Sequence, residues 1–158
     1  MKLRILGCSG GIGGESLRTT SLLVDDDVLI DAGTGVGDLP IEELARIDHL
    51  FLTHTHLDHI ACLPLMIDSV AVRRSRPLTV YGAPAVLDIL RKHVFNWLVW
   101  PDFAEVPSAD NPFMRYQPIE LLKPVTLGGR SFTPLPVDHT VPAVGYRLDS
   151  GAGSLVFS

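Results

Sequence analysis

The segment that most constrains this chain is Thr-His-Thr-His-Leu-Asp-His at residues 53–59, which holds three of the six histidines and one carboxylate. The apolar run before it predicts a strand, so His54 and His56 lie two positions apart at an extended strand end and point the same way. Asp58 and His59 fall on the turn into the next predicted helix. Imidazole nitrogens and carboxylate oxygens are the ligands that zinc and similar divalent metals bind. Two such ligand pairs at a strand–helix corner predict a binuclear metal site of the hydrolytic kind, rather than a polar turn with surface histidines.

Two further segments supply candidates for the same site. Asp31 ends a predicted strand and is suited to orient a ligand imidazole through a hydrogen bond, although aspartate is also common in turns. His139 follows another predicted strand and is the natural third nitrogen ligand for a metal held by His54 and His56. The histidines that lack such surroundings are interpreted as structural: His49 and His93.

The remaining pattern predicts one layered domain of the α/β or α+β class over residues 1–158. Short apolar runs predict strands at residues 3–6, 21–24, 28–30, 49–52, 78–81, 125–127, 131–137, 144–148 and 155–157. Helical patterns cover residues 41–46, 57–72 and 83–97, and Pro64 should interrupt the second of them. Three aspartates at 25–27 predict a hairpin turn. The aromatic and proline-rich residues 100–118 predict a long loop, of the kind that often forms a lid.

A glycine-rich loop, Gly-Cys-Ser-Gly-Gly-Ile-Gly-Gly, occupies residues 7–14. A dinucleotide-binding fingerprint would open directly into a helix, whereas residues 19–24 here predict another strand. The loop is therefore interpreted as the edge of a site and not as a cofactor-binding turn.

The net charge and the number of cysteines limit the partners and the cellular location expected for this protein. The formal net charge of −5 disfavours a nucleic-acid partner, because phosphates need clustered Lys and Arg. The densest basic stretch, Arg73, Arg74 and Arg76, is predicted to be a solvated helix end. Cys8 and Cys62 are too few for a disulfide scaffold and are predicted to be reduced and buried. Neither a signal peptide nor an apolar run of about 20 residues is present, so we expect no membrane partner and a cytoplasmic location.

These motifs resemble the metallo-β-lactamase superfamily, whose HxHxDH signature matches residues 54–59 and whose fold is an αββα sandwich. Residues 54–69, His-Thr-His-Leu-Asp-His-Ile-Ala-Cys-Leu-Pro-Leu-Met-Ile-Asp-Ser, further resemble the signature of the class II 3′,5′-cyclic-nucleotide phosphodiesterases. Cys62 stands where that signature usually has Gly or Ser. Residues 93–103, His-Val-Phe-Asn-Trp-Leu-Val-Trp-Pro-Asp-Phe, also resemble a segment of that family, so the resemblance runs over nearly the whole chain.

The resemblance implies a zinc-dependent hydrolase that opens cAMP or cGMP to the 5′-nucleotide, with Mn²⁺ or Fe²⁺ as alternative metals. His54, His56 and His139 would hold one zinc, while Asp58 and His59 would contribute to the other. Asp58 would also orient the attacking hydroxide. The side chains that would line the nucleoside pocket, or else only pack the lid, are Phe95, Asn96, Trp97, Trp100 and Phe103. The expected partner is a small-molecule cyclic nucleotide, and a homodimer is left open.

Two ligands of the superfamily are not found in this sequence. One is an Asp that bridges both metals, expected directly after a strand of the type at residues 155–158, and the other is a last histidine. The resemblance therefore predicts a domain whose C-terminal part is missing, which binds about one metal well and hydrolyses poorly. Two alternatives stay open: another hydrolase on the same scaffold (a tRNA 3′-processing endonuclease, an arylsulfatase or a lactonase), or a non-catalytic fragment that binds metal or a partner.

Overall fold

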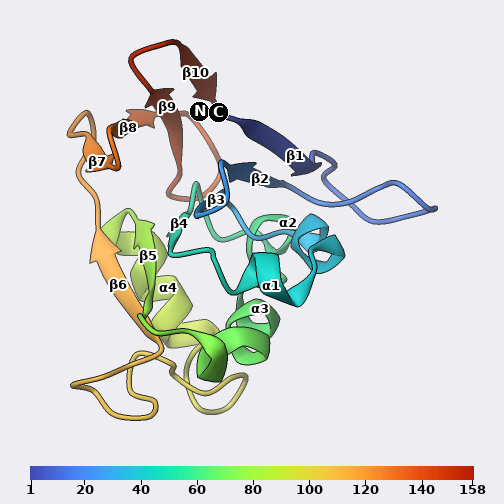
Figure 1. Ribbon diagram of the computed structural model, residues 1–158, viewed down its shortest axis with the longest axis vertical. Helices are drawn as coiled ribbons and strands as arrows, with labels where there is room; N and C mark the ends of the chain where they lie inside the picture. The colour runs from blue at the N-terminus through green and yellow to red at the C-terminus, as the bar shows by residue number, and fades with distance from the viewer.

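Two β-sheets and a layer of short helices make up the fold in the computed structural model, which describes all residues 1–158 (Figure 1). The larger sheet has the strand order β1-β2-β3-β4-β5-β6 and the smaller one β10-β9-β8-β7. The strands are β1 (Leu3–Gly7), β2 (Ser21–Val24), β3 (Val28–Ile30), β4 (His49–Phe51), β5 (Leu78–Gly82), β6 (Met114–Pro118), β7 (Val125–Leu127), β8 (Arg130–Pro136), β9 (Val144–Asp149) and β10 (Ser154–Phe157). The helices are η1 (Thr34–Asp38), α1 (Ile41–Leu44), α2 (Leu57–Ile60), α3 (Leu63–Val70), η2 (Ala71–Arg73) and α4 (Pro84–His93). No helix among these has the length and apolar character needed to cross a bilayer.

The larger sheet is covered on both faces, and alternate residues of its central strands serve the two sides. Leu50 lies in an apolar cluster with side chains of α3 and α4, whereas the next residue, Phe51, lies in a second cluster with Phe132 and Tyr146 of the smaller sheet. Because β3, β4 and β5 are parallel and buried on both faces, their sequences read as short continuous apolar runs. The mixed α/β class and the sandwich of two sheets predicted from the sequence are confirmed.

Several predicted elements are found with small shifts in their ends. The aspartates at 25–27 form the turn between the antiparallel strands β2 and β3. Pro64 lies in the first turn of α3, so the helical stretch predicted at residues 57–72 is divided into α2, α3 and η2. This division follows from the proline, which cannot continue a helix that began upstream of it.

The helix predicted at residues 83–97 is too long, because α4 ends at His93. The Asn96 side-chain oxygen accepts hydrogen bonds from the backbone N–H groups of Leu98 and Val99, at 3.0 and 2.8 Å. Trp97 follows with a φ of 66°, in the left-handed region. Asparagine thus offers the backbone a local turn that competes with the helix.

The loop predicted at residues 100–118 is also wrong in its last five residues, which form β6. This strand pairs in parallel with β5, beginning with Leu78 opposite Met114. It lies at the edge of the sheet, and most of its side chains are exposed. An edge strand of this kind carries no continuous apolar run, and the sequence pattern therefore concealed it.

Two smaller expectations are corrected. Arg74 is not part of a solvated face: its side chain is only 3% exposed, and it donates hydrogen bonds to the Ala45 carbonyl and the Asp48 carboxylate at 2.8 Å each. Cys8 is exposed rather than buried, while Cys62 is half-buried, and both are unpaired.

Arg130, at the start of β8, joins the two sheets by an ionic contact. Its guanidinium donates to the Asp25 carboxylate at 2.9 Å and to both oxygens of Asp27 at 2.7 Å. The arginine side chain is 12% exposed and each aspartate 33% exposed. The hydrogen bond from the Lys2 backbone N–H, and after it the contact with Arg130, hold the pKa of Asp25 below its usual value.

Replacing this arginine tests the contact. We expect Arg130→Met to lower the free energy of unfolding by about 1–2 kcal/mol at pH 7. The substitution removes charged hydrogen bonds, and because these are partly exposed to solvent, each contributes less than a buried one would. Since the folded-state pKa of Asp25 is lowered, its stabilisation is present above the unfolded pKa of about 3.9 and is lost as pH falls through the folded value. The difference between wild type and variant, measured by urea unfolding, should therefore stay constant from pH 7 to about pH 5 and shrink only as the pH falls below about 4.

Arg147→Met is the matched control, because that side chain is 55% exposed and pairs only with Asp149 of its own strand. An equal effect of the two substitutions at pH 7, or an Arg130→Met effect that does not change with pH, would contradict this account.

Candidate metal centre

Strand β4 and the loop between β8 and β9 bring the candidate ligands together. His54 and His56 come shortly after β4, beyond Leu52 and Thr53, at the carboxyl end of the parallel strands, and His56 is the residue before α2. Asp58 and His59 lie within α2. His139 comes from the β8–β9 connection of the other sheet, so the two sheets each contribute part of the cluster.

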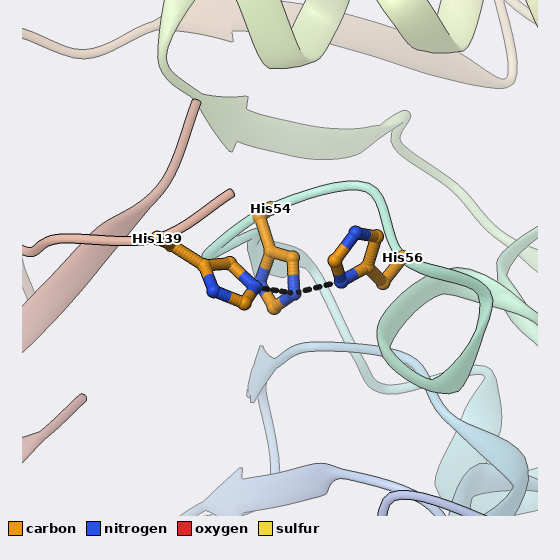
Figure 2. Close-up of side chains that lie close together, drawn as sticks. All are labelled: His54, His56 and His139. Atoms are coloured by element: carbon orange, nitrogen blue, oxygen red, sulfur yellow. Dashed lines mark hydrogen bonds between the residues drawn. The ribbon is translucent and has the colours of Figure 1, made fainter. Parts of the chain in front are cut away.

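The side chains of His54, His56 and His139 point toward one another (Figure 2). His54 Nε2 lies 3.1 Å from His56 Nδ1 and 3.2 Å from His139 Nε2. One nitrogen from each ring falls within 4.8 Å of the other two. His54 is buried, His56 is half-buried and His139 is exposed, so the cluster runs from the protein interior to an open side.

Thr53 holds the His54 ring in the orientation that frees Nε2. The Thr53 hydroxyl donates to Asp31 Oδ2 at 2.8 Å, and its oxygen lies 3.0 Å from His54 Nδ1. Because the hydroxyl proton is committed to the carboxylate, the oxygen accepts from Nδ1–H. The proton of neutral His54 therefore sits on Nδ1, and the Nε2 lone pair faces the other two imidazoles.

Asp31 orients His59 in the same way. Its buried carboxylate accepts the Thr53 backbone N–H at 2.8 Å and lies 2.7 Å from His59 Nδ1. Burial alone would lower the pKa of His59, but the hydrogen bond to Asp31 and the charge of that carboxylate raise it overall. His59 Nε2 lies on the far side of the ring, 3.4 Å from Asp58 Oδ2. Asp58 and His59 thus form a second small group beside the three histidines.

The Asp31 turn fits against α2 through a close backbone approach. The Ala32 N–H donates to the His59 carbonyl at 2.6 Å. A Cβ on Gly33 would lie 2.4 Å from the Asp58 carbonyl oxygen, so only glycine is accommodated at this position. Asp31 itself has a φ of 57°. The Asp-Ala-Gly sequence therefore sets the distance between the carboxylate and the imidazole it orients.

The donor set fits a divalent metal ion. Burial, together with the nearby His59, His139 and His56, lowers the pKa of His54 to about 4, so that ring is neutral and free to donate a lone pair at pH 7. Nitrogen ligands about 2.0–2.1 Å from a tetrahedral ion lie about 3.3 Å apart. The His54 nitrogen lies close to this distance from the His56 and His139 nitrogens, at 3.1 and 3.2 Å, and the His56 and His139 nitrogens lie within 4.8 Å of each other. His54, His56 and His139 would hold one ion, and Asp58 with His59 would contribute to a neighbouring one.

The cluster opens into a cavity of about 840 Å³. The expected glycine-rich loop edges it through Gly7 and Cys8, and the sequence-predicted residues His54, His56, Asp58, His59 and His139 all line it. Asp31 lies behind them, fully buried. The residues expected to bind substrate do not line the cavity: Phe95, Asn96, Trp97, Trp100 and Phe103.

Those residues have other roles in this structure. Asn96 shapes the turn after α4, and the Trp97 indole N–H donates to Glu105 at 3.2 Å. Phe95 and Phe103 are buried in the apolar core beneath the helices, and Trp100 packs against it. The sequence reasoning also overlooked Thr53, which links Asp31 to His54. The only sequence feature that indicated this role was its position directly before His54.

This chain is similar to known proteins in both sequence and fold. Residues 42–139 match the family model described as cAMP phosphodiesterases class-II. The chain is 34% identical to 3′,5′-cyclic-nucleotide phosphodiesterase 1 of Saccharomyces cerevisiae, over 63% of this chain and 27% of that protein. It is 29% identical to ribonuclease Z of Treponema pallidum, over 92% of this chain and 46% of that protein. The chain thus spans less than half the length of these two relatives.

Solved structures share the fold at low sequence identity. The metallo-β-lactamase fold protein YhfI of Bacillus subtilis superimposes with a TM-score of 0.72 and 22% identity, over 98% of this chain and 61% of that one. Unliganded yeast PDE1 gives a TM-score of 0.68 and 19% identity, over 94% and 61% of the two chains. The short form of human tRNase Z gives 0.67 and 18%, over 99% and 68%. The fold is that of the metallo-β-lactamases, and because the matching segment, residues 42–139, spans more than half of the chain, the chain belongs to the class-II cAMP phosphodiesterase family.

Proposed function

We propose that this protein is a divalent-metal hydrolase that opens the 3′,5′-cyclic phosphodiester of a nucleotide to give the 5′-nucleotide. The observation that carries the proposal is the convergence of three imidazoles beside a carboxylate, within the segment that matches the class-II cAMP phosphodiesterases. Zinc is the proposed ion, because an all-nitrogen set of this size is typical of it, and Mn²⁺ or Fe²⁺ are the alternatives. The proposed location is the cytoplasm, in keeping with two unpaired cysteines.

Some side chains of the site would bind metal ions, and Asp58 would also accept the proton of the attacking water. Bound ions would lower the pKa of a water molecule and offset the negative charge of the phosphate. The Asp58 carboxylate, whose side chain is 29% exposed and lines the cavity, would orient the attacking water and accept its proton. In the overall reaction the water oxygen joins phosphorus, the bond from phosphorus to the 3′ oxygen breaks, and that oxygen ends with a proton.

The shape and lining of the cavity suit a nucleotide. Its volume of about 840 Å³ lies within the range of small-molecule sites, about 300–1,000 Å³. The polar lining includes the histidines and Asp58, and the apolar lining includes Leu22, Leu135, Val137 and Val144. We assign the cyclic phosphate to the polar lining residues and the nucleoside to the apolar ones.

A second candidate, a tRNA 3′-processing endonuclease, is favoured by one observation. Ribonuclease Z of Treponema pallidum matches 92% of this chain, a longer stretch than the 63% matched by the yeast phosphodiesterase, although at lower identity. Against it stands the formal net charge of −5, because tRNA binding relies on clustered cations. The cyclic nucleotide therefore remains the leading proposal, with no nucleic-acid partner.

Removal of one ligand tests the metal site. We expect His56→Ala to weaken Zn²⁺ binding by more than about 100-fold, since loss of a direct ligand should exceed the 10–100-fold effect of losing an outer partner. The measurement is the dissociation constant for Zn²⁺ by competition with a chelator. His93→Ala, an exposed histidine at the end of α4, is the matched control and should bind as wild type does. Unchanged zinc affinity in His56→Ala would refute the assignment of the site.

Substrate choice is tested by comparing two phosphodiesters. We expect the zinc-loaded protein to hydrolyse cAMP or cGMP to the 5′-nucleotide slowly, because the bridging Asp and the last histidine of the superfamily are not found in residues 1–158. We expect a precursor tRNA with a 3′ extension to be neither cleaved nor bound in a salt-dependent manner. The His56→Ala variant should lose the activity, which excludes a contaminating enzyme. Cleavage of the tRNA without turnover of either cyclic nucleotide would overturn the leading proposal in favour of the second candidate.

A further inference from the structure

Leu52 and Thr53, the two residues before His54, have all their backbone N–H and carbonyl groups hydrogen-bonded. The N–H groups bind on one side of the segment and the carbonyl groups on the other. The Leu52 N–H donates to the Tyr81 carbonyl at 2.9 Å, and the Thr53 N–H donates to Asp31 Oδ1 at 2.8 Å. Both partners belong to the larger sheet or to the turn at its end. The two carbonyl groups, in contrast, accept hydrogen bonds from the smaller sheet. The segment at residues 52–53 is therefore held from both sheets at once.

Tyr146 of β9 supplies the first of these contacts. Its hydroxyl donates to the Leu52 carbonyl at 2.9 Å, with both groups buried. Burial, with a smaller contribution from Asp31, raises the pKa of Tyr146 well above its usual range, so the hydroxyl stays protonated and can donate. The ring stands edge-on to Phe51, with centroids 5.5 Å apart. Tyr146 thus reaches the segment through a buried interface in which an unpaired carbonyl would be unfavourable.

Val144, two residues earlier in β9, supplies the second contact. Its N–H donates to the Thr53 carbonyl at 3.0 Å. Val144 is also the first residue of β9 after the connection that carries His139. Two consecutive carbonyl groups before His54 are thus fixed to the strand that immediately follows the His139 loop. The spacing between His54 and His139 depends on this junction, because the two histidines come from different sheets.

We propose that Tyr146 is a positioning residue of the metal site, which sets the separation of His54 and His139 through its hydrogen bond to the Leu52 carbonyl. The inference rests on the proposed metal site and adds to it a residue that does not touch the metal. Loss of the hydroxyl frees the Leu52 carbonyl from the smaller sheet. The His54 imidazole, two residues on, is then less firmly held opposite His139, and metal affinity falls even where the fold is kept.

The chain offers a closely matched control. Tyr81 stacks on the same Phe51 ring, with centroids 4.4 Å apart, and belongs to the same apolar cluster as Tyr146. Its hydroxyl, however, lies 3.3 Å from His49 Nδ1, at the opposite end of β4 from the ligands. Tyr81→Phe and Tyr146→Phe therefore each remove one hydroxyl from the same aromatic cluster, and only the second removes a link to the histidines.

The test is the dissociation constant for Zn²⁺ of wild type, Tyr146→Phe and Tyr81→Phe, measured by chelator competition on the folded proteins. We expect Tyr146→Phe to weaken zinc binding by roughly 10-fold, in the range found for outer partners of metal ligands, and Tyr81→Phe to stay within about twofold of wild type. If Tyr146→Phe is only marginally folded, the dependence of its urea midpoint on free Zn²⁺ gives the native-state constant by linkage.

Each outcome is informative. Equal zinc affinity of Tyr146→Phe and wild type overturns the positioning role while leaving the histidine site intact. Equal weakening in both variants assigns the effect to general loosening of the aromatic cluster and overturns it as well. Absence of zinc binding in wild type would instead remove the metal site itself, and with it the proposed function.

Discussion

The carboxyl end of β4 is the point on which the rest of the structure depends. This short strand is paired in parallel on both sides, by β3 and β5, and its Leu50 and Phe51 are fully buried in the two apolar clusters. Burial on both faces leaves the strand no freedom to slide, because a shift of one residue would exchange its two faces. The histidines that follow therefore leave the sheet at a fixed place, and the smaller sheet brings His139 to that place.

Polar contacts then orient the imidazole rings at the carboxyl end of β4. The Asp31 carboxylate and the Thr53 hydroxyl link the turn after β3 to the imidazoles of His54 and His59. Each ring is held through its Nδ1 atom, which directs Nε2 toward the cavity. Burial and neighbouring imidazoles keep His54 neutral. The same packing that stabilises the fold thus prepares nitrogen lone pairs for a cation, and the cost of gathering three imidazoles is offset when an ion binds between them.

The sequence was a good guide wherever the pattern was local and apolar. The strands at the centre of the sheets, the hairpin at residues 25–27 and the division of the helix at Pro64 were predicted from short runs and from proline chemistry. β6 could not be, since its exposed side chains carry no apolar run. The end of α4 depends on the side chain of Asn96 folding back onto its own turn, which competes with a helical pattern that extends further.

The cluster at residues 54–59 could be proposed from its spacing alone, because His54, His56, Asp58 and His59 are close in sequence, whereas His139 was proposed from its place after another predicted strand. Their partners were harder to predict. Asp31 could be proposed from its position at a strand end, but its contact with His59 in particular, and the bridging role of Thr53, follow from the tertiary approach of a turn to α2. The aromatic residues around Trp97 were expected from their types to bind a nucleoside, and in this structure none of them lines the cavity.

The central claim is that His54, His56 and His139 bind a divalent metal through nitrogen. X-ray absorption spectroscopy of the zinc-loaded protein tests it most directly. The account predicts a first shell of nitrogen and oxygen atoms at about 2.0–2.1 Å, with the outer-shell scattering of about three imidazole rings. A sulfur scatterer at about 2.3 Å, which Cys8 at the edge of the cavity would supply, or a shell without imidazole scattering, would contradict it.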